Sequence, residues 1–148
     1  MEKDTIVIDL DGTLANIAYR RHLVQQDKPD WDKFYAECRY DEVNFWCREL
    51  MAGMRQKGYE IVIVSARRKS CKADTVDWLR FNDIPYQTLY LLRNDNDHTE
   101  DKELKRNWLS FYDKDRVLFV VDDRQKVVDM WRSEGLVCLQ CDKWEEKK

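Results

Sequence analysis

The stretch IVIDLDGTLAN, Ile6 to Asn16, decides the fold, because an apolar run that suits a buried strand leads directly into two carboxylates. Asp9 and Asp11 lie two residues apart, so their side chains share one face if the extended geometry continues that far. Two carboxylates so close destabilise each other unless a cation or a bound proton neutralises one of them. Gly12 permits a sharp departure from the sheet, and Thr13 offers a hydroxyl and an amide to a phosphate oxygen. The stretch therefore predicts a strand end at which a cation or a phosphate group binds.

Two further apolar runs end in polar residues of the same kind. VLFVVDDR ends in Asp122, Asp123 and Arg124, and adjacent acids on a buried strand suit a hard cation such as magnesium. YEIVIVS ends at Ser65, and Arg67 follows it closely. A hydroxyl and the planar fork of an arginine both suit phosphate recognition. Two acidic strand ends in one small chain point to a common site.

Apolar runs of strand length alternate with segments of helical periodicity along the whole chain. We expect strands over residues 5–10, 60–64, 88–92, 117–121 and 137–139. Helices are expected over residues 72–81, 99–111 and 125–134, and a further helix is expected to be capped by Asp41 and ended by Gly58. Strands that are apolar throughout imply a parallel sheet covered on both faces, so the predicted fold is a doubly wound, Rossmann-like α/β sheet of about five strands. Ligands bind such sheets beyond the carboxyl ends of the strands.

The length of 148 residues predicts a single domain, residues 1–148. The segment before the second strand is too long for an ordinary loop, and we expect residues 15–57 to form an inserted lid or cap that leads into a core helix. Its aromatic residues Trp31, Phe34 and Tyr35 favour a lid over a disordered connector. They are suited to stack on a base or to pack a small core of the lid itself.

Composition limits the classes of partner. With 43% apolar and 37% charged residues, and no apolar window near the roughly 18 residues of a membrane span, we expect a cytoplasmic globular protein, in the host cytoplasm if a phage encodes it. The net charge of -3 gives no general attraction to nucleic acid, so a phosphate-bearing partner needs a local basic patch. The candidate residues for this patch are Arg20, Arg21, Arg67, Arg68 and Arg124. The alternative is that these arginines form only a solvated rim. The oligomeric state stays open.

A helix after the third strand offers two lysines that could lend a positive charge to the site. Lys105 lies three and four residues before the apolar Trp108 and Leu109, which favours it over Lys102. With this lysine, the motifs resemble those of the haloacid dehalogenase superfamily of phosphotransferases. The four motifs occur in order at Asp9 to Thr13, at Ser65, at Lys105 (or Lys102), and at Asp122 with Asp123.

A narrower resemblance rests on V-S-A-R and on VVDDRQKVVDMWRSEGLVCLQ. These segments are similar to the 3'-phosphatase half of phage-type polynucleotide kinase-phosphatases. Residues 15–40 have no match in that half, and no G-x-x-x-x-G-K-[ST] phosphate loop occurs, so no kinase activity is implied.

The resemblance implies a mechanism. Asp9 would attack a phosphomonoester, and Asp11 would act as general acid and then as general base. A magnesium ion would be held by Asp9, by the backbone carbonyl of Asp11, and by Asp122 or Asp123. The remaining contacts to phosphate would come from Thr13, Ser65 and Lys105.

These inferences favour a magnesium-dependent phosphatase that removes 3'-phosphates from nucleic-acid ends. A nucleotidase that acts on mononucleotides is the alternative among enzymes, because a lid could close over a small substrate. Outside enzymes, the alternative is a regulator that accepts phosphate without turnover. The expected partner is therefore a phosphorylated nucleic-acid end or a nucleotide.

Overall fold

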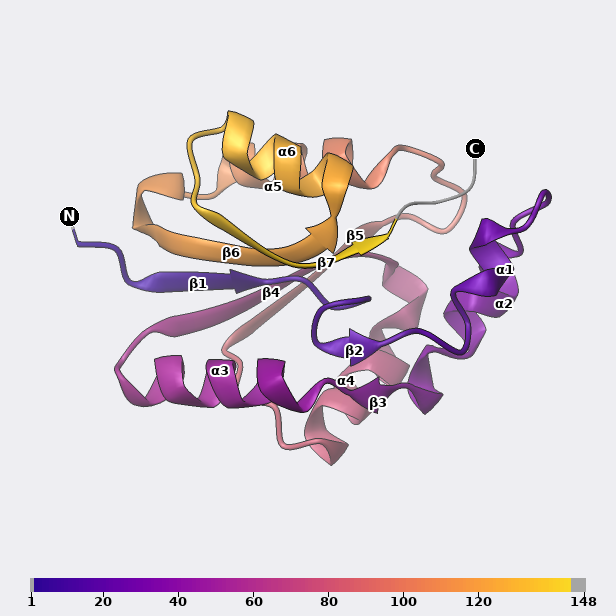
Figure 1. Ribbon diagram of the computed structural model, residues 1–148, viewed down its shortest axis with the longest axis horizontal. Helices are drawn as coiled ribbons and strands as arrows, with labels where there is room; N and C mark the ends of the chain where they lie inside the picture. The colour runs from indigo at the N-terminus through magenta and orange to yellow at the C-terminus, as the bar shows by residue number, and fades with distance from the viewer. Residues whose placement is uncertain (1, 145–148) are drawn as a thin grey trace.

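The computed structural model describes residues 2–144, and a five-stranded sheet lies at its centre (Figure 1). Every pair of neighbouring strands in this sheet is parallel. The strands, in spatial order, are β5 (Thr88–Arg93), β4 (Glu60–Arg68), β1 (Thr5–Ile8), β6 (Val117–Arg124) and β7 (Cys138–Trp144). The predicted doubly wound α/β fold is confirmed.

Helices cover both faces of the sheet, as the apolar strands require. One face carries α3 (Phe45–Gln56) and α4 (Lys72–Phe81), and the other carries α5 (Asp101–Phe111) and α6 (Gln125–Ser133). Side-chain alternation along β1 divides the core accordingly, because Ile6 and Ile8 pack in one apolar cluster and Val7 in the other. Short 3₁₀ helices lie at Lys69–Cys71 and Lys114–Arg116.

The segment between β1 and α3 folds beside the carboxyl ends of the strands, at the right of Figure 1. Its elements are β2 (Ala15–Asn16), α1 (His22–Gln25), α2 (Trp31–Ala36), a 3₁₀ helix (Cys38–Tyr40) and β3 (Glu42–Val43), which pairs with β2 in antiparallel fashion. We call residues 15–44 the cap segment.

Asp41 does not cap α3, so that prediction was wrong. The helix begins at Phe45 after Asn44, and the carboxylate of Asp41 instead accepts hydrogen bonds from the buried side chain of Arg20. A guanidinium is a stronger partner for a buried carboxylate than a backbone amide is. The predicted end of α3 is close to the observed one, since Gly58 follows it with a φ of 100°.

The central strand is shorter than its neighbours at the carboxyl edge. β1 ends at Ile8, which pairs with Ile63 of β4 and Val121 of β6, but β4 continues to Arg68 and β6 to Arg124. The sequence predicted that both neighbours would end earlier, at residues 64 and 121. The polar residues beyond those positions therefore lie within strands, and this fixes the directions of their side chains.

Within residues 2–144, every helix is too short or too polar to cross a membrane.

Candidate active site

A buried lysine joins the acidic residues of two strand ends. The Lys105 ammonium group donates to Asp9 at 2.8 Å and to Asp122 at 2.9 Å, and all three side chains are less than 9% exposed. Burial alone would lower the pKa of Lys105, but the carboxylates of Asp122 and Asp9 raise it, so the lysine is protonated. Lys102 lies at the surface, 3.6 Å from Glu100. The structure thus places Lys105, and not Lys102, in the acidic cluster.

Three carboxylates gather around this lysine. Oxygen atoms of Asp9, Asp122 and Asp123 lie within 4.8 Å of one another, and all three residues are buried. Burial and the charge of Asp122 raise the pKa of Asp9 to about 6, although Lys105 opposes the rise. Burial, Asp9 and Asp122 raise the pKa of Asp123 well above its ordinary value. One lysine does not neutralise three buried carboxylates, and an all-oxygen donor set of this kind fits a magnesium ion.

Asp122 is the more firmly held of the two adjacent acids. One of its oxygens accepts from Lys105 and from the indole of Trp131 at 3.1 Å, and the other accepts from the backbone amide of Asp123 at 2.8 Å. Trp131 had no signal in the sequence beyond the apolar face of its helix. Its indole N–H adds a third hydrogen bond to this carboxylate.

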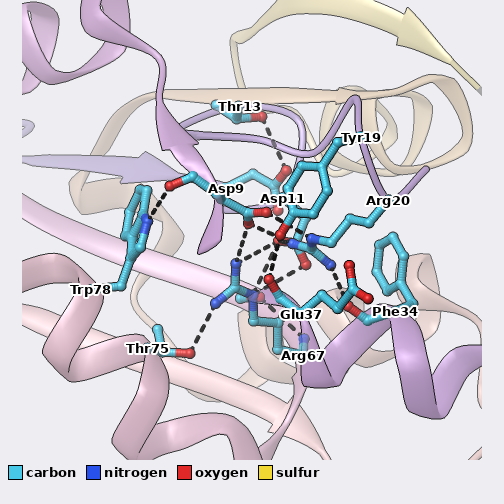
Figure 2. A network of polar contacts seen from close by, with 12 residues as sticks. Asp9, Asp11, Thr13, Tyr19, Arg20, Phe34, Glu37, Arg67, Thr75 and Trp78 are labelled. Carbon is cyan, nitrogen blue, oxygen red and sulfur yellow. Dashed lines mark hydrogen bonds and ion pairs between the residues drawn. The ribbon is translucent and has the colours of Figure 1, made fainter. Parts of the chain in front are cut away.

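The carboxylate of Asp11 is held by two arginines. Figure 2 shows Arg20 and Arg67 converging on Asp11. The Nη2 atoms of Arg20 and Arg67 lie 2.6 and 2.7 Å from Oδ1 of Asp11. Burial would raise the pKa of Asp11, but Arg67 and Arg20 together hold it below its ordinary value. Arg67 also donates to Thr75 at 2.9 Å, which anchors it to α4. Asp11 is therefore an ionised carboxylate that accepts hydrogen bonds from both Arg20 and Arg67.

Asp41 of the cap segment completes this cluster. It accepts two hydrogen bonds from Arg20, at 2.8 and 2.7 Å, and Arg67 lies 3.4 Å away. Its backbone carbonyl accepts from the indole of Trp78 on α4 at 2.7 Å. The guanidinium of Arg20 also lies 4.2 Å from the ring of Phe34, so Arg20 links the cap segment to Asp11, just beyond the carboxyl end of β1.

Thr13 and Ser65, which the sequence predicted as phosphate contacts, both have buried side chains. The hydroxyl of Thr13 donates to Asp9 at 3.0 Å, and it lies 3.4 Å from Asp123. Ser65 lies inside β4, where its hydroxyl accepts from the amide of Arg67 at 3.1 Å. Ser65, Arg67 and Lys105 line a small cavity of about 30 Å³ together with the carboxylates of Asp9 and Asp11.

Arg21 and Arg124, which the sequence also predicted for the basic patch, have different environments. Arg21 lies on the rim, 3.6 Å from Asp142 of β7, and does not line this cavity. Arg124 does line it, and its guanidinium forms an ion pair with Asp101 of α5. Asp101 also accepts from Arg93 at 2.6 Å. Sequence reasoning missed Asp101, although it lies one helical turn before Lys105 and so shares its face of α5.

The sequence matches a known protein family over nearly its whole length. The family model of the polynucleotide kinase PNKP phosphatase domain matches residues 3–145. The chain belongs to this phosphatase family. The predicted resemblance to the haloacid dehalogenase superfamily and to polynucleotide kinase-phosphatases is thereby confirmed, and so is the prediction of an enzyme rather than a phosphate-accepting regulator.

The solved structures that this phosphatase domain resembles include chains that are much longer than it is. Two chains from structures of the Pnkp1/Rnl/Hen1 RNA repair complex are each 29% identical to it, with TM-scores of 0.77 and 0.76. Both matches cover 95% of this phosphatase domain, but it spans only 43% and 46% of those chains. A haloacid dehalogenase-like hydrolase from Streptococcus pneumoniae, 13% identical, shares the fold with a TM-score of 0.65 over 93% of this chain and 84% of its own.

Replacement of Arg20 and replacement of its chain neighbour Arg21 should have very different effects on the free energy of unfolding. Replacing Arg20 by glutamine leaves the buried carboxylate of Asp41 without its main partner, and we expect a loss of about 3 to 5 kcal/mol in the free energy of unfolding. Replacing Arg21 by glutamine removes a partly exposed ion pair with Asp142 and should cost about 0 to 1 kcal/mol. Urea unfolding of both variants measures the difference. Equal losses would contradict the structural role assigned to Arg20.

Proposed function

We propose that this chain removes terminal phosphate from the 3' ends of nucleic acids through a phosphorylated Asp9. The observation that carries the proposal is the position of Asp9, which is held between Lys105 and Thr13 in a small buried cavity with Asp11 two residues beyond. The family match and the relatives from an RNA repair complex support the choice of a nucleic-acid substrate. A carboxylate with both oxygens held in this way is prepared to act as a nucleophile.

The first step transfers the phosphoryl group to the protein. A carboxylate oxygen of Asp9 attacks phosphorus, the bond from phosphorus to the 3' oxygen breaks, and Asp11 gives its proton to that oxygen. Lys105 keeps Asp9 in place and offsets its negative charge as a dianionic phosphate approaches. A magnesium ion held by Asp9, by Asp122 or Asp123, and by the Asp11 carbonyl would supply further charge neutralisation when bound.

The second step restores the free carboxylate. A water molecule gives its proton to Asp11 and attacks phosphorus, and the bond between phosphorus and Asp9 breaks to release inorganic phosphate. The same residue thus serves as acid in the first step and as base in the second.

The arginine cluster has to rearrange for Asp11 to carry a proton. In the structure, Arg67 and Arg20 both bond to Asp11 and lower its pKa. A phosphate dianion competes for the same guanidinium groups, which suit its oxygens. Once Arg67, which lines the small cavity, turns toward phosphate, Asp11 keeps only Arg20 as a cationic partner, and burial then raises its pKa so that it can hold the proton that the leaving oxygen needs.

Substrate comparison tests the proposal. The purified chain is assayed in magnesium with a 3'-phosphorylated oligonucleotide and with a panel of nucleoside monophosphates. We expect the higher kcat/KM on the oligonucleotide. A higher kcat/KM on the mononucleotides would instead support the nucleotidase alternative, which a cavity of about 280 Å³ beside the site also favours. No phosphate release from any of these phosphomonoesters would overturn both.

Magnesium should stabilise the folded chain through the carboxylate cluster. An ion at about a hundred times its Kd adds about 2.7 kcal/mol, which corresponds to a rise in Tm of several degrees. Replacing Asp123 by asparagine removes one of the three clustered carboxylates and should reduce this rise. The control Asp142→Asn, on the exposed rim, should keep it. Thermal unfolding with and without magnesium gives the result, and an unchanged rise in the Asp123→Asn variant would exclude Asp123 as a ligand and leave Asp122 as the acid that holds the ion with Asp9.

A further inference from the structure

A larger cavity opens directly beside the catalytic one. It has a volume of about 280 Å³, near the lower end of the range of about 300 to 1,000 Å³ for small-molecule sites. The two cavities share Trp31, Tyr35, Asp101 and Arg124 in their walls. A ligand that occupies the larger cavity can therefore extend a phosphate group toward Asp9.

An aromatic wall from the cap segment bounds this cavity. The rings of Trp31 and Tyr35 on α2 stack at 5.9 Å with an angle of 27°, and Phe34 meets both rings edge-on at 5.4 Å. Phe34 and Tyr35 are almost fully buried, whereas Trp31 is partly exposed. The buried rings fix the indole in place, so it offers a rigid surface on which a flat ring can stack at little entropic cost.

Basic side chains outnumber acidic ones in the remaining walls. Five basic and three acidic side chains line the cavity, so it carries an excess of positive charge in a chain whose net charge is -3. Asp101, the acid nearest the catalytic cavity, is already bonded to Arg93 and Arg124. Arg68, on the aromatic side, lies 5.0 Å from the ring of Tyr35. An aromatic platform beside basic side chains suits a ligand that has both a flat ring and phosphate groups.

We propose that this cavity binds the nucleoside that carries the terminal phosphate, with its base stacked on Trp31. The inference rests on the proposed function, since it assigns the substrate's last nucleotide to a particular place next to Asp9. The basic side chains then face the phosphodiester that leads to the rest of the strand. A nucleobase supplies the flat ring, and its own phosphate supplies the group that enters the small cavity.

Removing the base from the substrate tests the inference without altering the protein. Two oligonucleotides of equal length carry the same 3'-phosphate, one on an ordinary nucleotide and the other on a terminal abasic tetrahydrofuran residue. Loss of stacking on an aromatic side chain typically costs 1 to 3 kcal/mol, so we expect wild-type kcat/KM to be roughly tenfold lower on the abasic end.

Variants of the tryptophan complete the test. The Trp31→Ala variant should lose most of its preference for the base-bearing end, because removal of the base and removal of the indole delete the same contact. Trp31→Phe retains a ring and should keep part of the preference. Trp46→Ala, on α3 and 46% exposed, lies outside both cavities and should keep all of it.

The outcomes separate this inference from the proposed function. Equal wild-type rates on the two ends would overturn the nucleoside site and leave the 3'-phosphatase activity standing. A preference that persists in Trp31→Ala would also overturn it. No release from either oligonucleotide, with hydrolysis of p-nitrophenyl phosphate retained, would overturn the proposed function and this inference together. The wild-type comparison needs no variant, so it stands even if Trp31→Ala fails to fold.

Discussion

The Asp9→Asn variant is expected to lose phosphatase activity by at least about a thousandfold, the scale on which removal of a nucleophile reduces turnover. An amide cannot form the acyl-phosphate bond at phosphorus. Asparagine has nearly the same shape, and its carbonyl oxygen can still accept from Lys105. Release of inorganic phosphate under saturating substrate measures the loss.

Folding of the Asp9→Asn variant provides the control. The change removes one of three buried carboxylates that repel one another, so the free energy of unfolding should not fall appreciably at neutral pH. A variant that unfolds like the wild type but releases no phosphate isolates the chemical role. Turnover at the wild-type rate would refute Asp9 as the nucleophile.

The Lys105→Met variant is expected to lose both activity and stability. Lys105 provides the positive charge between Asp9 and Asp122, and without it two buried carboxylates face each other uncompensated. Breaking a buried ion pair from one side costs about 3 to 5 kcal/mol, and loss of one such electrostatic group reduces kcat by about 100- to 1,000-fold. Urea unfolding and steady-state kinetics measure the two effects.

The matched change Lys102→Met lies on the same helix but at the surface. It should alter the free energy of unfolding by less than about 1 kcal/mol. Magnesium should restore part of the stability that Lys105→Met loses, because a divalent ion can neutralise the same carboxylates. If the two lysine variants behaved alike, the central position of Lys105 in the cluster would be wrong.

Periodicity and residue chemistry were sufficient to predict the sheet and its acidic edge. Strands that are apolar throughout fixed a parallel sheet, and parallel strands bring their carboxyl ends to one edge. That rule alone placed Asp9 beside Asp122 and Asp123, although more than a hundred residues separate them in the chain. Lys105 could be preferred over Lys102 because its apolar neighbours indicated the buried face of its helix.

The partners of Asp11 could not be read from the sequence in the same way. Asp41 stands before a helix and has the local pattern of a cap, so nothing nearby indicates that it binds Arg20 across the cap segment. Arg67 seemed to follow a strand, but the strand continues through it, and this buries its guanidinium against Asp11. Such contacts depend on tertiary packing between segments that local patterns do not relate.

The unequal lengths of the strands have a consequence for what the enzyme can cleave. Because β1 stops at Ile8 and both neighbours continue, residues of β4 and β6 line the cavity of about 30 Å³ that the carboxylate of Asp9 also lines. A cavity of this size suits a phosphate that ends a strand better than a phosphate that carries sugars on both sides. We therefore expect internal linkages to be spared by shape alone, before any side chain has to discriminate.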